Sequence, residues 1–212
     1  MTAPPGIPEE EGPWDEFCPS HGSLQGEGAK QRTLFVHIDG ACPGNGTKSA
    51  IGGIGIYFGP SSRYNLSAII NRNIVQPPTS QQAELTAATR ALEIIREKCI
   101  PARRELVNTV IFCPCHTGCW AMMFPFQAVI VTDSAYLFDC MISHLTIWRW
   151  DPKTQVYTNK KSGKSIVNSK YIRNVVKQVE MLAERGVQVL WKKVPRALNQ
   201  EADRLAKAGA KM

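Results

Sequence analysis

Residues 33–46 constrain the fold of this chain more than any other stretch. The first seven read Thr-Leu-Phe-Val-His-Ile-Asp, a run dense in β-formers that is typical of a strand and ends on Asp39. Gly40, Pro43 and Gly44 follow, and they turn the chain sharply because they cannot extend a strand. A carboxylate at the end of a buried strand is costly unless it is paired or binds a cation. The stretch therefore predicts a strand that ends in a cation-binding group.

Two further carboxylates lie at the ends of predicted elements. Glu84 lies near the start of a helix predicted over residues 80–99, with Thr79 or Ser80 as its N-cap. Asp133 ends a second apolar strand. Each side chain is thus expected at the rim of an element rather than in the middle of a surface.

A fourth carboxylate, Asp203, follows four residues after Asn199, a good N-cap residue, in a predicted final helix. Carboxylates are the ligands that hard divalent cations prefer, and a pair of Mg²⁺ ions about 4 Å apart is suited to in-line cleavage of a phosphodiester. We therefore predict a catalytic metal site formed by four side chains: Asp39, Glu84, Asp133 and Asp203.

At these positions the chain resembles type 1 ribonuclease H. The matching strings, in chain order, are Asp39-Gly-Ala-Cys-Pro-Gly-Asn-Gly, Thr79-Ser-Gln-Gln-Ala-Glu-Leu, Thr132-Asp-Ser and Asn199-Gln-Glu-Ala-Asp-Arg-Leu-Ala. The resemblance covers roughly residues 32–212. It implies an endonuclease that hydrolyses the RNA strand of RNA·DNA hybrids with two Mg²⁺ ions, for which Mn²⁺ is expected to substitute. The implied products carry 5′-phosphate and 3′-hydroxyl ends.

Two other functions stay open at this point. One is a hybrid-binding domain with weak or absent catalysis, which the four carboxylates argue against. The other is a related nuclease of the integrase or transposase type, although such proteins usually lack the Asn45 and Gln81 pair described below.

The order of predicted elements is that of an α/β protein with a mixed five-stranded sheet flanked by helices. Strands are predicted over residues 33–39, 51–58, 65–70, 128–133 and 186–194. Helices are predicted over residues 80–99, 134–145, 169–185 and from 200 onward. Three strands joined by short turns pair antiparallel, and two strands reached through helices add in parallel. This is the layout of the ribonuclease H-like fold.

The resemblance also implies contacts to the substrate. Asn45 and Gln81 match residues that touch RNA 2′-hydroxyls in the minor groove, the contact by which a protein distinguishes RNA from DNA. Thr79 and Asn168 match residues that grip a DNA phosphate two steps from the scissile position. The family's arginine partner in that pocket is absent, because Pro77 stands there.

Aromatic and basic residues gather in the last third of the chain. The resemblance places Tyr136 and Trp148 in the groove for the DNA strand, with Trp150 as a structural residue. The plainer alternative is that both tryptophans are core residues at the end of a helix. Residues 151–171 carry five lysines and Tyr157 among turn formers, which suits a groove for a nucleic-acid backbone.

The link before the last helix departs from the family. Many members carry a histidine there, in a glycine-containing loop, where it assists proton transfer or product release. Residues 195–198 read Pro-Arg-Ala-Leu and contain no histidine. They resemble the branch with a Val-Pro-Arg linker, in which we expect Arg196 to contact the substrate and turnover to be slower.

Residues 100–127 exceed what a helix-to-strand link needs. Three cysteines and one histidine within residues 113–119 could bind Zn²⁺, although ligands so close in sequence give poor tetrahedral geometry. A disordered insertion is the plainer alternative. A retained intron at 107–127 is the third, since valine codons begin with splice-donor bases and Phe124-Pro-Phe-Gln matches a pyrimidine tract before an acceptor.

Charge divides the chain into a tail and a body. Of the formal net charge of +7, residues 1–31 contribute −5, because six acids face one lysine there, and the remainder carries +12. A basic body attracts phosphates. Residues 1–31 are rich in Pro, Gly and Glu without apolar periodicity, so we predict a disordered tail before a catalytic domain at 32–212.

Targeting signals are not recognisable in the sequence. We find no secretory signal, no mitochondrial presequence and no apolar run suited to a membrane span. We therefore expect an intracellular protein of the cytoplasm or nucleus that acts as a monomer on RNA·DNA hybrids and not on membranes. Its seven cysteines are expected to be free thiols.

Overall fold

The computed structural model describes part of the chain. The described residues are 17–18, 22–23, 32–70, 77–100 and 126–212. Most of the predicted tail and nearly all of the region assigned to zinc binding, insertion or a retained intron lie outside these ranges. The disordered tail and the three alternatives for residues 100–127 therefore remain predictions. Within the tail, β1 (Phe17–Cys18) and β2 (Gly22–Ser23) pair antiparallel.

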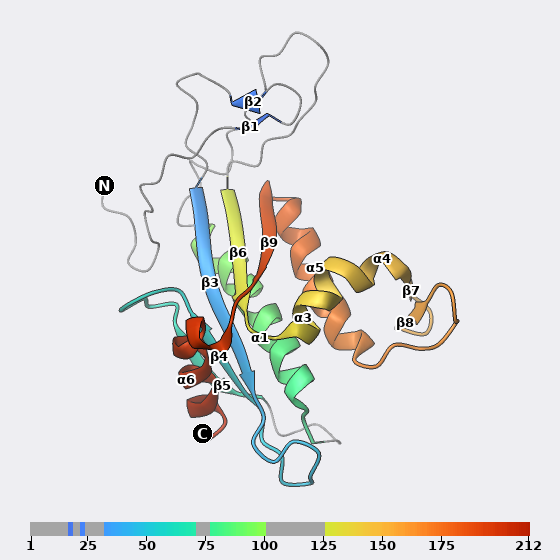
Figure 1. Ribbon diagram of the computed structural model, residues 1–212, viewed down its shortest axis with the longest axis horizontal. Helices are drawn as coiled ribbons and strands as arrows, with labels where there is room; N and C mark the ends of the chain where they lie inside the picture. Colours follow the sequence, from blue (N-terminus) through green and yellow to red (C-terminus); the bar gives the residue numbers. More distant parts are fainter. Residues whose placement is uncertain (1–16, 19–21, 24–31, 71–76, 101–125) are drawn as a thin grey trace.

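A mixed five-stranded sheet forms the centre of the molecule (Figure 1). Its strands are β3 (Arg32–Ala41), β4 (Gly53–Tyr57), β5 (Leu66–Ile69), β6 (Phe126–Thr132) and β9 (Val187–Lys193). The spatial order is β5-β4-β3-β6-β9; β4 pairs antiparallel with β3 and β5, whereas β6 pairs parallel with β3 and β9. The predicted fold class is confirmed.

Helices follow the strands in the predicted order. They are α1 (Ser80–Ile94), which continues as the π-helix η1 (Ile95–Cys99), then α3 (Ala135–Asp139), η3 (Cys140–His144), α4 (Leu145–Ile147), α5 (Ser169–Ala183), the 3₁₀ turn η4 (Arg196–Leu198) and α6 (Gln200–Gly209). None of the helices in the described ranges is both long and apolar enough to cross a membrane.

Opposite faces of the sheet are covered by different helices. Leu34, Val36 and Ile38 of β3 are fully buried together with Leu85 and Leu92 of α1. Because side chains alternate along a strand, the other face of β3 and β4 is left for α6. The alternation of apolar residues in the sequence therefore places α1 and α6 on opposite sides of the sheet.

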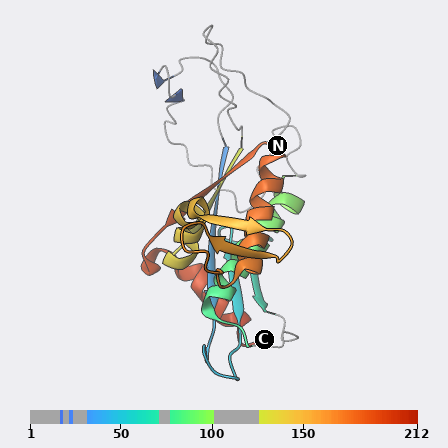
Figure 2. The same ribbon diagram turned by 90° about the vertical axis from the view of Figure 1, so that its right-hand side faces the viewer.

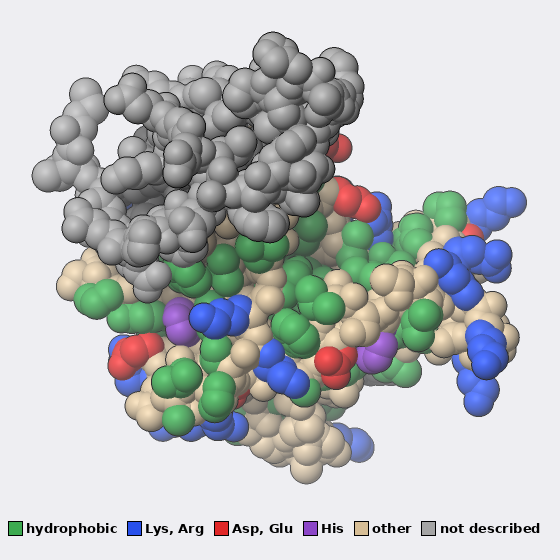
Figure 3. Space-filling view, turned by 45° about the horizontal axis from the view of Figure 1, so that its top comes forward, with side chains coloured by type: hydrophobic (Ala, Val, Ile, Leu, Met, Phe, Trp, Pro, Cys, Tyr) green, Lys and Arg blue, Asp and Glu red, His purple; other side chains and the backbone are tan. Residues whose placement is uncertain are grey.

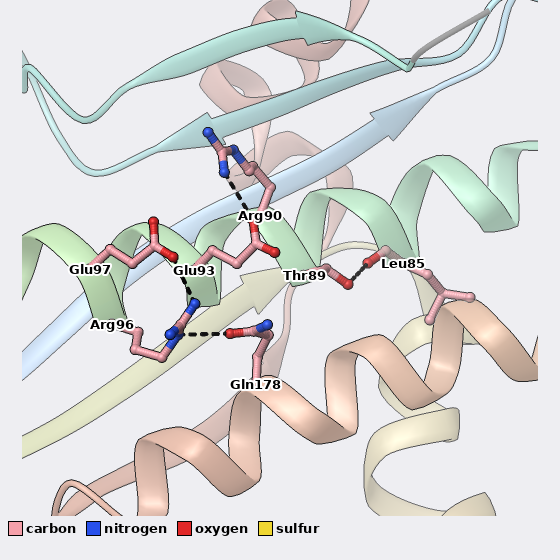
Figure 4. Close-up of polar contacts among 7 residues, drawn as sticks. All are labelled: Leu85, Thr89, Arg90, Glu93, Arg96, Glu97 and Gln178. Atoms are coloured by element: carbon pink, nitrogen blue, oxygen red, sulfur yellow. Dashed lines mark hydrogen bonds and ion pairs between the residues drawn. The ribbon is translucent and has the colours of Figure 1, made fainter. Parts of the chain in front are cut away.

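α1 and α5 lie side by side (Figure 2) and are joined by polar contacts as well as apolar ones. Arg96 Nε donates a hydrogen bond of 3.0 Å to Oε1 of the buried Gln178, and the same guanidinium pairs with Glu97 at 2.7 Å (Figure 4). This contact holds the C-terminal part of the α1–η1 helix to the middle of α5.

Residues 148–159 form a hairpin that the sequence analysis did not predict. Trp148 and Trp150 both lie in β7 (Trp148–Asp151), which pairs with β8 (Val156–Asn159). Trp148 is also the C-cap of α4 and both side chains pack against the core, so the alternative of core residues at a helix end holds for Trp148, whereas Trp150 lies beyond the helix end. The ring of Trp150 lies 4.9 Å from that of Tyr157 across the hairpin, and Arg173 of α5 lies 5.7 Å from the Trp150 ring. These ring contacts join β7 to β8 and the hairpin to α5.

Candidate active site

Two parallel strands bring Asp39 and Asp133 to the same edge of the sheet. His37 of β3 pairs with Val131 of β6, so Asp39, two residues on, lies level with Asp133 immediately after β6. Neighbouring parallel strands end at the same edge, and the charge of Asp133 contributes to the raised pKa of Asp39.

Glu84 reaches this edge from α1 because Gly40 has no side chain. A Cβ at Gly40 would lie 2.3 Å from the backbone nitrogen of Glu84, closer than any side chain tolerates. Thr79 caps α1: its Oγ1 accepts from the backbone nitrogen of Gln82 at 3.2 Å, and the Gln82 side chain accepts from Thr79 N at 3.1 Å. Thr79 is therefore the N-cap, one of the two predicted candidates.

Asp203 approaches from α6, which packs closely against a glycine of β4. A Cβ at Gly55 would lie 2.0 Å from the carbonyl oxygen of Ala202. Both carboxylate oxygens of Asp203 have cationic partners: Oδ1 accepts from Arg196, and Oδ2 lies 2.6 Å from Lys207 Nζ. Burial opposes the charge of Asp203, but the hydrogen bonds from Lys207 and Arg196 outweigh it and lower the pKa.

The ionised forms of Asp39 and Glu84 are disfavoured by burial and by neighbouring negative charges. Burial, followed by the charges of Asp133 and Asp203, raises the pKa of Asp39 to about 6. Burial, followed by the charges of Asp39 and Asp133, raises the pKa of Glu84 to about 9. Within the described part of the chain, Glu84 Oε2 is buried and has no hydrogen-bond partner. Such a cluster favours either proton uptake or a bound cation.

The residues present fit a divalent cation, although they do not form a ready-made metal site. Among the described residues no group of three or more His, Cys, Asp and Glu side chains is already placed to hold a metal ion. Asp203 is engaged by Arg196 and Lys207, and the remaining carboxylates repel one another. The donors are carboxylate oxygens, which hard cations prefer, and the partnerless Glu84 Oε2 is an available ligand atom.

Asn199 organises the cluster in a way that the sequence did not predict. It stands at the N-cap position of α6, but its side chain makes no capping hydrogen bond, so that part of the prediction is wrong. Its Nδ2 donates to Ile38 O at 2.8 Å and to Asp133 Oδ1 at 2.9 Å, and its Oδ1 lies 3.2 Å from His37 Nδ1. The only sequence signal was a polar residue shortly before Asp203.

Asn45, in the loop after β3, contacts Ser80, the first residue of α1 and the neighbour of Gln81 in the chain. Asn45 Nδ2 lies 3.4 Å from Ser80 Oγ, and Ser80 N donates to Asn45 Oδ1 at 3.3 Å. The loop after β3 is thereby docked against the start of α1, where Gln81, the residue after Ser80, is exposed.

Thr79, Asn168 and Tyr136 also belong to one polar network. Asn168 Nδ2 donates to Gln81 Oε1 at 3.1 Å and to the Tyr136 hydroxyl at 3.2 Å. Gln82 links Thr79 to Asn168, since its Nε2 donates to Asn168 Oδ1 at 3.2 Å. Four of the predicted substrate contacts, Thr79, Gln81, Tyr136 and Asn168, are thus joined by hydrogen bonds at the starts of α1, α3 and α5.

The remaining predicted contacts, Trp148 and Arg196, are placed differently. Trp148 is half-buried, with its ring 5.1 Å from that of His144 and 6.2 Å from that of Tyr157. Arg196 is exposed and pairs with Asp203, and its charge opposes the rise in the pKa of Asp39 and Glu84 that burial causes. Arg196 therefore faces the carboxylate cluster.

Basic side chains are exposed around the β7–β8 hairpin and the loop that follows it (Figure 3). They are Arg149, Lys153, Lys160, Lys161 and Lys164. The predicted basic stretch is thus presented to solvent beside the aromatic rings of the hairpin, where it can attract a polyanion.

The strand order and the carboxylates at the ends of β3 and β6 define an α/β protein of the ribonuclease H-like class. The family model described as RNase H matches residues 31–211, and the chain belongs to this family. Enzymes of the family use divalent metal ions.

Curated and solved relatives agree with this assignment. Human Ribonuclease H1 is 28% identical over 182 residues, which cover 84% of this chain and 50% of that protein, so the chain spans about half the length of this relative. LC9-RNase H1, a type 1 RNase H with the type 2 active-site motif, is similar in structure with a TM-score of 0.52 and 23% identity, covering 84% of this chain and 72% of that one. LC11-RNase H1 in complex with an RNA/DNA hybrid has a TM-score of 0.50 and 18% identity, covering 84% and 96%.

Proposed function

We propose that this chain hydrolyses the RNA strand of RNA·DNA hybrids, leaving 5′-phosphate and 3′-hydroxyl ends. The observation that carries the proposal is the Glu84 carboxylate, whose pKa is raised to about 9 and whose Oε2 is buried without a partner in the described part of the chain. Asp39 and Asp133 add their charges to the same place. A divalent cation relieves all three side chains at once.

The proposed metal ligands are Asp39, Glu84, Asp133 and Asp203, which together would hold two Mg²⁺ ions, with Mn²⁺ as a substitute. When bound, such a pair of cations activates a water molecule and stabilises the leaving 3′ oxygen. Asn199 links Asp133 to β3 by hydrogen bonds to both Asp133 and Ile38. Gly40, which has no side chain, lets the backbone of Glu84 approach β3 closely. Arg196 and Lys207 neutralise Asp203 in the metal-free protein.

Recognition of the hybrid is assigned to the polar network beside the carboxylates. Asn45 and Gln81 would contact the RNA 2′-hydroxyls, while Thr79, Asn168 and Tyr136 would hold the DNA strand. Trp148 offers a ring face to the same strand, and Arg196 contacts a phosphate near the cluster. The solved complex of LC11-RNase H1 supports this choice of substrate, since that protein binds an RNA/DNA hybrid with the same fold. The proposed catalytic domain spans residues 32–212 and acts as a monomer.

A cleavage assay tests the proposal. Matched RNA·DNA hybrid, duplex DNA and duplex RNA are incubated with the protein and Mg²⁺, with Asp39→Asn as the inactive control. The expected result is cleavage of the RNA strand of the hybrid alone. Cleavage of duplex DNA would instead indicate an integrase-type nuclease, and tight hybrid binding without cleavage would indicate a binding domain.

A further inference from the structure

Gln82 has no role in the proposed chemistry, yet it lies between two of the residues assigned to the DNA strand. It is half-buried in the first turn of α1. Its Oε1 accepts from the backbone nitrogen of Thr79 at 3.1 Å, and its Nε2 donates to Asn168 Oδ1 at 3.2 Å. One side chain thus connects the first turn of α1 with the residue that precedes α5.

The direction of every hydrogen bond in this chain of contacts follows from its first member. A backbone N–H can only donate, so the Gln82 oxygen must face Thr79, and the Gln82 nitrogen must face Asn168. The Asn168 oxygen then faces Gln82. Its nitrogen is left to donate to Gln81 Oε1 at 3.1 Å and to the Tyr136 hydroxyl at 3.2 Å.

We propose that Gln82 is a positioning residue that fixes the amide of Asn168, so that N–H groups and not a carbonyl oxygen face the bound nucleic acid. The inference rests on the proposed function, in which Asn168 helps to hold a DNA phosphate. A phosphate oxygen only accepts hydrogen bonds, so it can replace Gln81 Oε1 or the Tyr136 hydroxyl as the acceptor of an Asn168 N–H. A turned amide would present lone pairs to the phosphate and lose the contact. Pro77, close to this network in the chain, has no donor to offer in place of the lost one.

Asn168 itself depends on such support. Its backbone lies in the left-handed region with φ of 63°, a conformation that is uncommon for residues other than glycine. Its side chain makes no cap hydrogen bond to α5, so it is held by Gln82, Gln81 and Tyr136. Without Gln82, the remaining partners of the Asn168 amide are the Tyr136 hydroxyl and the Gln81 amide. Each of these groups can donate or accept a hydrogen bond, so neither fixes which way the Asn168 amide is turned.

The variant Gln82→Met tests this role, because methionine is uncharged like glutamine and its side chain is of similar length, but it cannot make these two hydrogen bonds. The matched control is Gln178→Met, since Gln178 also links α1–η1 to α5, through Arg96, but is not part of the Asn168 network. Binding of a labelled hybrid is measured by fluorescence anisotropy with Ca²⁺, which is expected to support binding without turnover. Gln82→Met should weaken binding about fivefold, the effect of about one neutral hydrogen bond, and Gln178→Met less than about 1.5-fold.

A double-mutant cycle distinguishes positioning from general loosening of the structure. In an Asn168→Ala background there is no amide to orient, so Gln82→Met should then change binding by less than about 1.5-fold. The salt dependence of binding should stay unchanged throughout, because no charge is altered. An equal loss in both backgrounds, or an equal loss for Gln178→Met, would overturn the inference. Failure of the unmodified protein to prefer the hybrid over duplex DNA would instead overturn the proposed function.

Discussion

The side-chain nitrogen of Asn199 donates a hydrogen bond of 2.9 Å to the carboxylate of Asp133, which lies on a different element of the site. The same nitrogen donates to the carbonyl oxygen of Ile38, one residue before Asp39. Asn199 therefore ties the start of α6 to the ends of both parallel strands. The mutual placement of three carboxylates depends on a residue that is not itself a metal ligand.

Replacing Asn199 by alanine should lower both stability and activity. Asn199 is 1% exposed, and its side chain donates a hydrogen bond to the carbonyl oxygen of Ile38. Loss of this donor in a buried place should lower the free energy of unfolding by about 1–3 kcal/mol. Urea unfolding measures the first effect and hybrid cleavage the second. Asn174→Ala, at an exposed position of α5, is the control and should change the free energy of unfolding by less than about 0.5 kcal/mol.

Asp39→Asn should separate activity from stability. Cleavage of the hybrid should fall by orders of magnitude, because a ligand charge shared between two cations is lost. The metal-free protein should become more stable at pH 8, on the order of 1 kcal/mol, since burial opposes the charge of Asp39. Glu201→Gln, an exposed acid on α6, should change neither. An Asp39→Asn protein that cleaves at the unmodified rate would rule out the assigned metal site.

The stability of the metal-free protein should fall as the pH rises from 5 to 9. The folded-state pKa values of Asp39 and Glu84, about 6 and about 9, lie above the ordinary values of 3.8 and 4.5. Their stabilising contribution is therefore complete below the ordinary values and is lost as the pH passes first 6 and then 9. Urea unfolding with a chelator at pH 5, 7 and 9 measures the decline.

Two additions to that experiment identify the source of the decline. Glu84→Gln should remove most of the change between pH 7 and 9, and excess Mg²⁺ should stabilise the unmodified protein most at the highest pH. Unchanged pH dependence in Glu84→Gln would mean that other groups cause it.

Lys207 should compete with the metal ions for Asp203. Its Nζ lies 2.6 Å from Asp203 Oδ2, whereas Arg204, on the same helix, pairs with Glu201 at 2.9 Å. Lys207→Gln and Arg204→Gln remove the same charge, but only the first frees a proposed ligand. Calorimetric titration should show a several-fold gain in Mg²⁺ affinity for Lys207→Gln and a gain below about twofold for Arg204→Gln. Equal gains would show that Lys207 acts only through net charge.

Asn45→Ala and Gln81→Ala should each reduce the preference for hybrid over duplex DNA. Each removes a proposed contact to a 2′-hydroxyl, worth about 1 kcal/mol for a neutral hydrogen bond. Binding to both duplexes over a range of salt concentrations checks the assignment. A smaller salt slope in either variant would mean that the residue contacts phosphate and not the 2′-hydroxyl.

Local patterns were sufficient to predict the sheet and the carboxylates. Leu34, Val36 and Ile38 are every second residue of a run of β-formers, and in a strand this spacing places their side chains on one face of the sheet. Asp133 stands directly after β6, as an apolar run followed by helix-starting residues predicts. The prediction that the first strand ends at Asp39 was wrong by two residues, because Gly40 and Ala41 continue β3 by pairing with Ile54 and Gly53. The N-cap at Thr79 was predictable because a capping box lies within four residues.

Other features depended on partners that are distant in the chain. Asn199 was predicted as a helix cap, yet it binds Ile38, 161 positions away, because a buried amide takes the donors and acceptors that packing brings to it. Gln82 and Asn168 meet across 86 positions, and the β7–β8 hairpin is held by Arg173 of the following helix. No local period encodes such contacts. The strands and helices and the carboxylates proposed as metal ligands thus follow from neighbouring residues, whereas the side chains that hold those carboxylates in place are determined by tertiary packing.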